Sequence, residues 1–288
     1  MYDVVIIGNG PAGLSAALYT CRAGLSTAII GLGNGALEKA DKIENYFGLE
    51  RTVSGKELID NGLEQVKKLG AKIIVDQVTD IMWMDKFIVT AKNNVLETES
   101  VIITTGASRK KVGIKGVIEF EGKGVSYCAV CDAFFYRNKQ VAVIGNGEYA
   151  LHETNELLQV ASKVYLLTNG SELRADFPPS VRIINTPISA LYGGEKFEGV
   201  EFTDNSRLSV SGIFIAMGTA AASDLARKLG VELSGNNIVV DNKMSTNVPG
   251  LYAAGDCIGG VLQVSVAVGE GAKAALGAIG FVRNKRKK

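Results

Sequence analysis

The chain has 288 residues, enough for about two domains at roughly 150 residues each, and each domain can bury a core without disulfide staples. Its 31 Lys and Arg residues balance 30 Asp and Glu residues, and the net charge of +1 excludes the global basic field of a nucleic-acid-binding protein. No apolar run reaches the roughly 18 residues of a membrane helix and the N-terminus lacks a signal-peptide pattern, so we expect no membrane partner and a cytoplasmic location.

The first predicted element is an apolar strand at 4–7 that runs into a glycine-rich turn and then a helix. In such a turn Gly8 bends the chain, Gly10 lets a pyrophosphate approach the backbone, and Gly13 allows the helix to pack closely on the strand. The next strand ends at Gly31, where many dinucleotide sites have a ribose-binding Asp or Glu. We therefore expect a dinucleotide unit that holds the ribose in another way.

A Cys-x-x-Cys pair, Cys128 and Cys131, lies near the middle of the chain and is followed by Asp132. A structural zinc site needs four Cys or His ligands, and four cysteines in distant motifs with one histidine do not favour a metal. Disulfide exchange needs one exposed thiol and a second thiol that resolves the mixed disulfide, and Asp132 can take or give the proton. The alternative, a structural disulfide or two buried thiols, is uncommon in the cytosol. We interpret Cys21 and Cys257 as packing residues and assign His152 no role.

A second glycine-rich unit follows the cysteine pair. A strand at 140–144 enters the turn 145–150, a helix is predicted at 151–160, and the next strand at 163–167. The chain thus holds two dinucleotide-binding-type units about half a chain apart.

Two apolar strands, at 101–106 and 212–218, each end in a small residue and glycine, and a last strand at 251–256 ends in Gly-Asp. The first two are expected to close the two units and to carry the chain between domains. We therefore predict an α/β fold with two Rossmann-like dinucleotide-binding domains, the second inserted into the first. The first domain comprises residues 1–110 and 219–288, and the inserted domain comprises residues 111–218.

Six motifs follow one another along the chain: GNGPAG at 8–13, ENYFG at 44–48, TTGAS at 104–108, GVSYCAVCD at 124–132, GNGEYA at 145–150 and YAAGD at 252–256. Together they resemble the low-molecular-weight thioredoxin reductases over essentially the whole length. The resemblance implies a homodimer with FAD on the first domain, a redox disulfide on the second and thioredoxin as protein substrate. It also implies that Cys128 attacks thioredoxin and that Cys131 exchanges electrons with the flavin.

The resemblance places the FAD site on the first glycine-rich turn, the Glu-Asn segment and the Gly-Asp turn, with Gln263 near the isoalloxazine ring. Leu262 stands where the family commonly has Arg, and Val264 where it has Ala. The residues expected to bind FAD are Gly8, Gly10, Pro11, Ala12, Gly13, Gly31, Asn45, Gly106, Gly255, Asp256, Gln263 and Val264.

The second glycine-rich unit departs from the family pattern in ways that argue against NADPH. The Glu148 carboxylate in the phosphate turn would repel a pyrophosphate, and Tyr149 could fill the space. Where the family carries His-Arg-Arg for the 2′-phosphate, this chain has Thr-Asn-Gly at 168–170, and Arg174 is the first cation. The pattern resembles the ferredoxin-dependent flavin thioredoxin reductases of anaerobes, which implies reduced ferredoxin as the electron donor.

Ferredoxins are generally acidic, so we expect a basic docking patch. The candidates are Arg109–Lys111 with Lys115, and the tail 283–288, which also fits a solvated terminus. Alternation of the cysteine pair between flavin and thioredoxin predicts hinges at 110–113 and 218–221.

Three other functions stay open at this point. An ordinary NADPH-dependent thioredoxin reductase with an unusual nucleotide loop is one. A flavin dithiol oxidase that passes electrons to oxygen is the second. A non-catalytic flavin-binding interaction protein is the third, although the intact cysteine pair argues against it.

Overall fold

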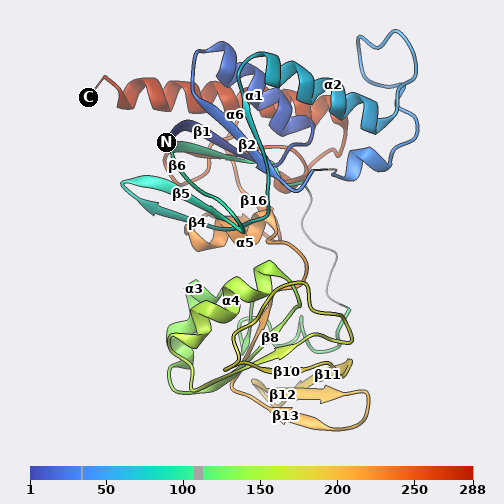
Figure 1. Ribbon diagram of the computed structural model, residues 1–288, viewed down its shortest axis with the longest axis vertical. Helices are drawn as coiled ribbons and strands as arrows, with labels where there is room; N and C mark the ends of the chain where they lie inside the picture. The colour runs from blue at the N-terminus through green and yellow to red at the C-terminus, as the bar shows by residue number, and fades with distance from the viewer. Residues whose placement is uncertain (34, 107–112, 288) are drawn as a thin grey trace. The chain divides into compact units, whose positions relative to one another are not determined.

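The computed structural model describes residues 1–33, 35–106 and 113–287. The chain divides into two compact units, Met1–Ser108 with Ala221–Lys288 and Arg109–Ala220 (Figure 1). The predicted α/β fold with two Rossmann-like units is confirmed, and each unit is described by itself. The return of the chain to the first unit falls two residues beyond the predicted position, and the outward crossing lies outside the described residues.

The first unit is built on one sheet with the strand order β3-β2-β1-β6-β5-β4, and β17 also pairs with β6. The first part of β6 pairs with β5 in antiparallel register, and its last residues lie between β1 and β17 in parallel register. Residues 4–7 of β1 are buried because layers cover both faces of the parallel part. The strands are β1 (Tyr2–Ile7), β2 (Thr27–Gly31), β3 (Lys72–Val75), β4 (Val78–Met84), β5 (Lys86–Ala91), β6 (Val95–Ile103) and β17 (Leu251–Ala253).

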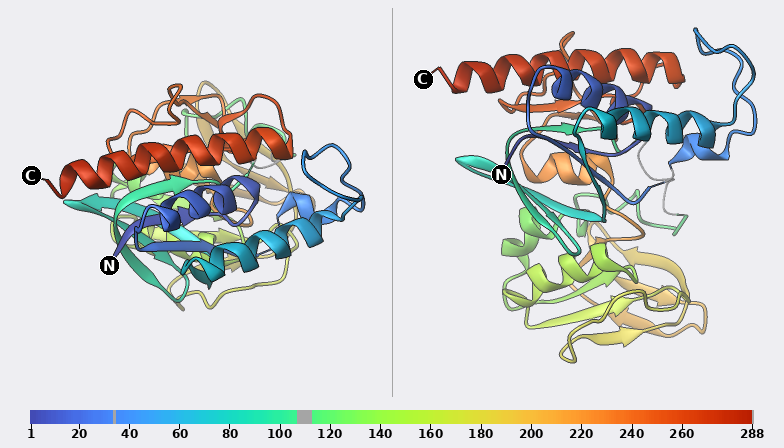
Figure 2. Two further views of the ribbon diagram at one scale, coloured as in Figure 1. Left: turned by 90° about the horizontal axis from the view of Figure 1, so that it is seen from above. Right: turned by 45° about the horizontal axis from the view of Figure 1, so that its top comes forward.

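Helices α1 (Pro11–Arg22), α2 (Gly55–Lys68) and α6 (Val264–Lys285) lie along one face of this sheet (Figure 2). α6 packs directly on α1, because a Cβ added to Gly271 would lie 2.1 Å from the carbonyl oxygen of Ala12. The short helix α5 (Ala222–Lys228) packs beside β4, where Lys228 and Asp80 form an ion pair of 3.2 Å with both side chains buried. Shorter elements of this unit are η1 (Ala36–Lys39), β15 (Leu233–Ser234), β16 (Asn237–Ile238) and η3 (Asp256–Ile258).

Among the described residues, α6 alone is long and apolar enough to cross a membrane, with a mean hydropathy of 1.3 in its most apolar window. The expectation that no segment reaches this length was therefore wrong by this criterion, because Glu270 and Lys273 are the only charged residues of α6 before Arg283 and Lys285 in its last turn. A core helix passes the same criterion, and Ala274, Ala275 and Ala278 of α6 belong to the buried core around α1. α6 is therefore weak support for a membrane span.

The second unit has a parallel sheet with the order β10-β9-β8-β14-β7 and a separate antiparallel sheet, β11-β12-β13. Its own core is formed by apolar side chains from both sheets. The strands are β7 (Val125–Ser126), β8 (Gln140–Ile144), β9 (Lys163–Leu167), β10 (Arg182–Ile184), β11 (Ile188–Gly193), β12 (Phe197–Phe202), β13 (Arg207–Ser209) and β14 (Gly212–Ile215). The helices are α3 (Ala129–Asp132), η2 (Ala133–Tyr136) and α4 (Glu148–Leu158).

Candidate active site

The first glycine-rich turn connects β1 to α1, and two of its glycines are required by close backbone contacts. A Cβ on Gly8, whose φ is +113°, would lie 2.4 Å from the carbonyl oxygen of Thr104. A Cβ on Gly13 would lie 2.0 Å from the carbonyl oxygen of Gly8. A Cβ on Gly10 would meet no atom within 4 Å in the part of the chain that the structure describes, its chain neighbours aside. The space beside Gly10, at the start of α1, is therefore open to a ligand.

The Gly-Asp turn after β17 lies against this same helix start. A Cβ on Gly255, whose φ is +79°, would lie 3.0 Å from the Cβ of Ala12. The backbone N–H of Gly255 donates to Glu270 Oε2 of α6 at 2.9 Å, and Asp256 opens the short helix η3. Glu270 therefore fixes the turn from α6. Glu270 was not predicted as a site residue, and nothing in its local sequence pattern indicates this contact.

Two predicted site residues that lie far apart in the sequence are joined by a hydrogen bond. Asn45 Nδ2 donates to Gln263 Oε1 at 3.1 Å, and Gln263 is followed directly by α6, which begins at Val264. Gly106, another predicted residue of this site, has a φ of +85° with no atom of the described chain within 4 Å of an added Cβ, its neighbours aside.

Gly31, at the end of β2, lies beside the side chain of Asn9. A Cβ on Gly31 would be 3.3 Å from Asn9 Oδ1. Asn9 belongs to the glycine-rich turn. Its side-chain amide therefore lies close to the place that the side chain of an acidic residue at position 31 would occupy. Asn9 is a candidate site residue that was not predicted from the sequence, because the glycine-rich pattern leaves its position open to any residue.

These features fit a flavin dinucleotide. The open space at Gly10 meets the N-terminus of α1, whose first backbone N–H groups have no partner inside the helix and favour a phosphate. Ala12 and Gly255 border the same helix start. Gly8, Gly10, Pro11, Ala12 and Gly13 would hold the diphosphate, and the roles of Gly31, Asn45, Asp256 and Gln263 stay predictions.

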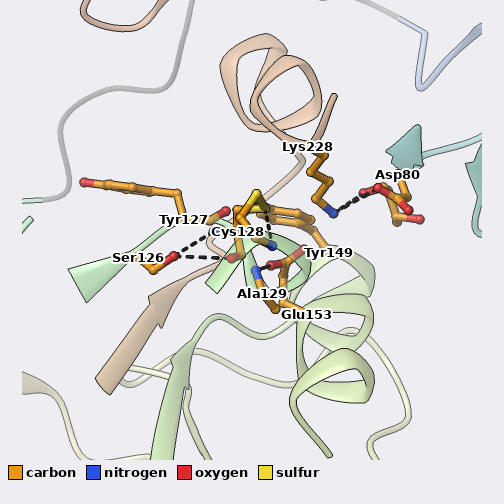
Figure 3. Close-up of a disulfide and its surroundings, with 10 residues drawn as sticks. Asp80, Ser126, Tyr127, Cys128, Ala129, Tyr149, Glu153 and Lys228 are labelled. Carbon is orange, nitrogen blue, oxygen red and sulfur yellow. Dashed lines mark hydrogen bonds and ion pairs between the residues drawn. A yellow bond between two sulfur atoms is a disulfide. The ribbon is translucent and has the colours of Figure 1, made fainter. Parts of the chain in front are cut away.

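In the second unit, Cys128 and Cys131 form a disulfide with a Cα–Cα distance of 5.3 Å (Figure 3). Cys128 Sγ accepts the backbone N–H of Cys131 at 3.1 Å. Cys128 is 1% exposed, whereas Cys131 is exposed. The thiol that the family resemblance assigns to thioredoxin is thus the inaccessible one in this arrangement.

The backbone on both sides of Cys128 is bound by side chains of α4. Tyr149 Oη donates to the carbonyl oxygen of Tyr127 at 2.9 Å, and Glu153 Oε2 accepts the N–H of Ala129 at 2.5 Å (Figure 3). Tyr149 and Glu153 are 0% and 1% exposed. Neither was predicted as a site residue, and the signal that could have found them is their spacing of four, which places both on one face of a helix.

Asp132 ends α3 and is half-buried. Burial, and in second place the negative charge of Asp132, raise the pKa of Tyr136, whose ring packs edge-on against Phe214 with a centroid distance of 5.3 Å. Tyr136 therefore anchors the segment after the cysteine pair to β14. A proton-transfer role for Asp132 stays a prediction.

The second glycine-rich turn, between β8 and α4, is covered by the chain itself. Asn146 Nδ2 donates to the carbonyl oxygen of Glu172 at 2.7 Å, and the N–H of Arg174 donates to the carbonyl oxygen of Asn146 at 2.7 Å. A Cβ on Gly147 would lie 4.0 Å from the Cβ of Arg174. Glu148 occupies the first helical position. The loop after β9 is thus bonded onto the turn where a pyrophosphate would lie.

The end of β9 also has internal partners where the family carries cations. Thr168 Oγ1 is hydrogen-bonded to Asn185 Oδ1, and the N–H of Gly170 donates to the carbonyl oxygen of Asn185 at 2.8 Å. Asn169 Oδ1 accepts the N–H of Ile188 at 2.7 Å. These side chains hold the loop in place rather than presenting positive charge.

The basic C-terminal tail, one candidate docking patch, is bound within the first unit. Arg283 donates to the carbonyl oxygen of Ala23 at 3.1 Å, and Lys285 and Arg286 form ion pairs of 2.5 Å with Glu99 and Asp3. These contacts tie three cations of the tail to the first unit, which the sequence could not reveal because their partners are distant in the chain. Of the other patch, Lys115 is exposed, and Arg109–Lys111, with most of the predicted hinge at 110–113, lie outside the described residues.

Within the described ranges, no group of three or more His, Cys, Asp or Glu side chains is placed to hold a metal ion. Cys257 is fully buried, and burial raises the pKa of its thiol to about 12. Cys21 is half-buried, with a pKa raised by burial. Both cysteines have the surroundings of packing residues.

Comparison with known proteins places the chain in a family. The family model of pyridine nucleotide-disulphide oxidoreductases matches residues 2–271. A thioredoxin reductase of Aquifex aeolicus is 37% identical, with 100% of this chain and 95% of that protein aligned.

Two solved structures extend the comparison. The atypical thioredoxin reductase TRi from Desulfovibrio vulgaris Hildenborough has a TM-score of 0.94 and 39% identity, with 99% of each chain covered. A ferredoxin-flavin thioredoxin reductase from Clostridium acetobutylicum has a TM-score of 0.73 and 33% identity, with 100% of this chain and 99% of that chain covered. The chain therefore belongs to the pyridine nucleotide-disulphide oxidoreductase family, among its thioredoxin reductases, and is a flavoprotein that binds FAD.

Proposed function

We propose that the protein reduces thioredoxin through the Cys128–Cys131 pair and receives its electrons from reduced ferredoxin rather than from NADPH. The observation that carries the choice of donor is the loop after β9, which is bonded onto the second glycine-rich turn through Asn146. A carboxylate at the first position of α4 and the absence of a cation cluster among the described residues at the end of β9 support it. The likeness to a ferredoxin-flavin thioredoxin reductase supports it as well.

The chemistry assigned to the chain is a two-electron disulfide reduction. FAD, when bound, collects single electrons from a one-electron donor and passes them on as a pair. The Cys128–Cys131 disulfide takes two electrons and two protons and becomes a dithiol. The Cys128 thiolate then attacks the thioredoxin disulfide, and Cys131 attacks the mixed disulfide, which releases reduced thioredoxin and restores the pair. Asp132 is the proposed proton carrier.

This cycle requires Cys128 to become accessible, since its side chain is buried. We assign the change to a movement of the second unit about its two connections, one of which includes Gly218 with a φ of +73°. The homodimer and the cytoplasmic location belong to the proposal and rest on the family resemblance and on the sequence.

The test is an anaerobic titration of the yellow protein, followed by flavin absorbance. NADPH, NADH and chemically reduced ferredoxin are added in turn, and thioredoxin is then added to measure its reduction. We expect bleaching with ferredoxin alone, and thioredoxin reduction that is lost in Cys128→Ser. Bleaching by micromolar NADPH would overturn the choice of donor, and failure of a bleached protein to reduce thioredoxin would overturn the substrate.

One observation favours NADPH as a second candidate donor. Arg174 is an exposed cation whose backbone is bonded to the second glycine-rich turn, so it is placed to meet a phosphate there. If this candidate is right, Arg174→Ala raises the KM for NADPH about tenfold or more, as expected for loss of a charge-assisted bond. With ferredoxin as donor, the same variant leaves turnover unchanged.

A further inference from the structure

The helix after the second glycine-rich turn has a second task at the cysteine pair. In a dinucleotide-binding unit the start of this helix faces the phosphates. Here its first two turns direct Tyr149 and Glu153 toward the segment that carries Cys128 (Figure 3).

The two contacts lie on either side of one cysteine. Tyr149 binds the carbonyl oxygen of the residue before Cys128, and Glu153 binds the N–H of the residue after it. Ser126 Oγ adds a third bond by accepting the N–H of Cys128 at 3.1 Å. The backbone of Cys128 is therefore held from both directions.

Because the side chains of Tyr149 and Glu153 are buried, the loss of either bond would be costly in free energy. A buried phenol and a buried carboxylate that lack a partner are costly, so each needs a polar group inside the protein. The Glu153 carboxylate, which is 1% exposed, keeps its bond to the N–H of Ala129 only while the segment holds this geometry. The contacts thus specify the position of Cys128 and do more than fill space.

We propose that Tyr149 and Glu153 are positioning residues that form a clamp on Cys128 and thereby stabilise the disulfide relative to the dithiol. Closing a disulfide removes conformational freedom from the two cysteines. When the peptide groups flanking Cys128 are already held, less freedom is lost on closure, and the effective concentration of the two thiols rises. A more stable disulfide makes the reduced pair a stronger reductant for its protein substrate. The proposal rests on the cysteine pair being the redox centre of the proposed function, whatever the electron donor.

The experiment measures the dithiol–disulfide equilibrium of the full-length flavoprotein in dithiothreitol buffers without oxygen. Free thiols are alkylated, and the peptide that contains Cys128 and Cys131 is counted by mass spectrometry. Tyr149→Phe and Glu153→Ala each remove one bond, and Glu153→Gln keeps an oxygen acceptor. Glu156→Ala, on the same helix, is the matched control, and circular dichroism checks that each variant is folded.

We expect Tyr149→Phe and Glu153→Ala each to shift the equilibrium toward the dithiol by about three- to tenfold, as for the loss of one hydrogen bond, and tenfold corresponds to about 30 mV. Glu153→Gln is expected to stay close to the unmodified protein, and Glu156→Ala to leave the equilibrium unchanged. No shift in folded Tyr149→Phe and Glu153→Ala would overturn the clamp, and an equal shift in Glu153→Gln or in Glu156→Ala would do so too. If Glu153→Ala does not fold, Tyr149→Phe decides alone, since it removes a single oxygen.

This assay uses neither ferredoxin nor thioredoxin. A negative result therefore refutes the clamp and leaves the proposed function standing. A positive result stands even if the titration with ferredoxin fails.

Discussion

At the scale of single residues, Gly31 determines how the first unit can hold a ribose. A glycine at the end of β2 supplies no carboxylate, and the nearest side chain to its missing Cβ is the amide of Asn9, at 3.3 Å. An amide oxygen can accept a hydrogen bond from a ribose hydroxyl, as a carboxylate does. Asn9 is thus the residue best placed to replace the missing acid.

Asn9→Ala is accordingly expected to weaken FAD binding by about three- to tenfold, the effect of one lost hydrogen bond. Flavin would be removed from the protein and its rebinding followed by quenching of flavin fluorescence. Leu32→Ala, next to Gly31 and exposed, serves as the control, and its affinity should not change. An unchanged affinity of Asn9→Ala for FAD would mean that other residues bind the ribose.

Asp76 gives a prediction about stability and pH. Its buried carboxylate accepts hydrogen bonds from the backbone N–H groups of Gln77 and Asn93 and from the side-chain amide of Asn94. Burial by itself raises the pKa of Asp76, but these hydrogen bonds outweigh it and lower the pKa below its ordinary value of 3.8. The folded state thus holds the proton less tightly than the unfolded state.

The resulting stabilisation is fully present above the unfolded pKa and is lost as the pH falls below about 4 through the lower folded pKa. Asp76→Asn should reduce the free energy of unfolding at pH 7 by about 1–3 kcal/mol, because donors lose a charged acceptor. It should also flatten the decline in stability below pH 4. Urea unfolding between pH 3 and pH 7 measures both effects, and an unchanged pH profile would show that Asp76 titrates alike in both states.

At the scale of elements, the sequence predicts strands well where apolar runs are uninterrupted. The predicted strands 140–144 and 163–167 match β8 and β9 without an error, because these runs are buried on both faces. The helix expected at 151–160 begins three residues earlier, at Glu148. The first turn of this helix is fixed by the glycine-rich turn and not by apolar periodicity. The apolar pattern alone therefore predicts a start that is too late.

The same contrast holds for the candidate site. The glycine-rich turns and the cysteine pair are local motifs, and their residues could be chosen from the sequence. The bond between Asn45 and Gln263 joins positions separated by 218 residues, and only the family resemblance implied that both belong to one site. The contact of Glu270 with a backbone N–H group has no local signature, because a backbone donor has no residue type to recognise. The spacing of Tyr149 and Glu153 indicates a shared helix face, but it does not identify the backbone groups that they bind.

The contact between α1 and α6 predicts an unusually large effect of a single methyl group. A Cβ on Gly271 would lie 2.1 Å from the carbonyl oxygen of Ala12, so Gly271→Ala must push the helices apart. We expect a loss of about 1–3 kcal/mol in stability and weaker FAD retention, because Ala12 lies at the start of α1 beside the Gly-Asp turn.

Gly280→Ala on the same helix is the matched control. It has no described atom within 4 Å of the added Cβ, apart from chain neighbours and the helix backbone, and should stabilise the protein by about 0.5–1 kcal/mol through helix propensity. Thermal unfolding with and without added FAD measures both variants. Equal effects of the same sign would mean that helix propensity, and not the α1–α6 contact, determines the result.

At the scale of the whole molecule, the division into two units separates the flavin site from the redox disulfide. The first unit has its core around α1 and α6, and the second has a different core between its two sheets. The contacts that we assign to the Cys128 clamp all lie inside the second unit. The disulfide should therefore keep its properties when the flavin unit is absent.

The fragment 113–220 tests this independence, because a unit with its own hydrophobic core can fold alone. We expect a cooperative urea transition, no FAD binding, and a dithiol–disulfide equilibrium within about threefold of that of the full-length protein, since the three clamp bonds are retained. Phe197→Ala in the fragment empties a buried position of the core and should abolish the transition, at a cost of about 3–5 kcal/mol. A folded fragment whose equilibrium differs more than about tenfold would show that the first unit contributes directly to the stability of the disulfide, because that difference exceeds the effect of one hydrogen bond.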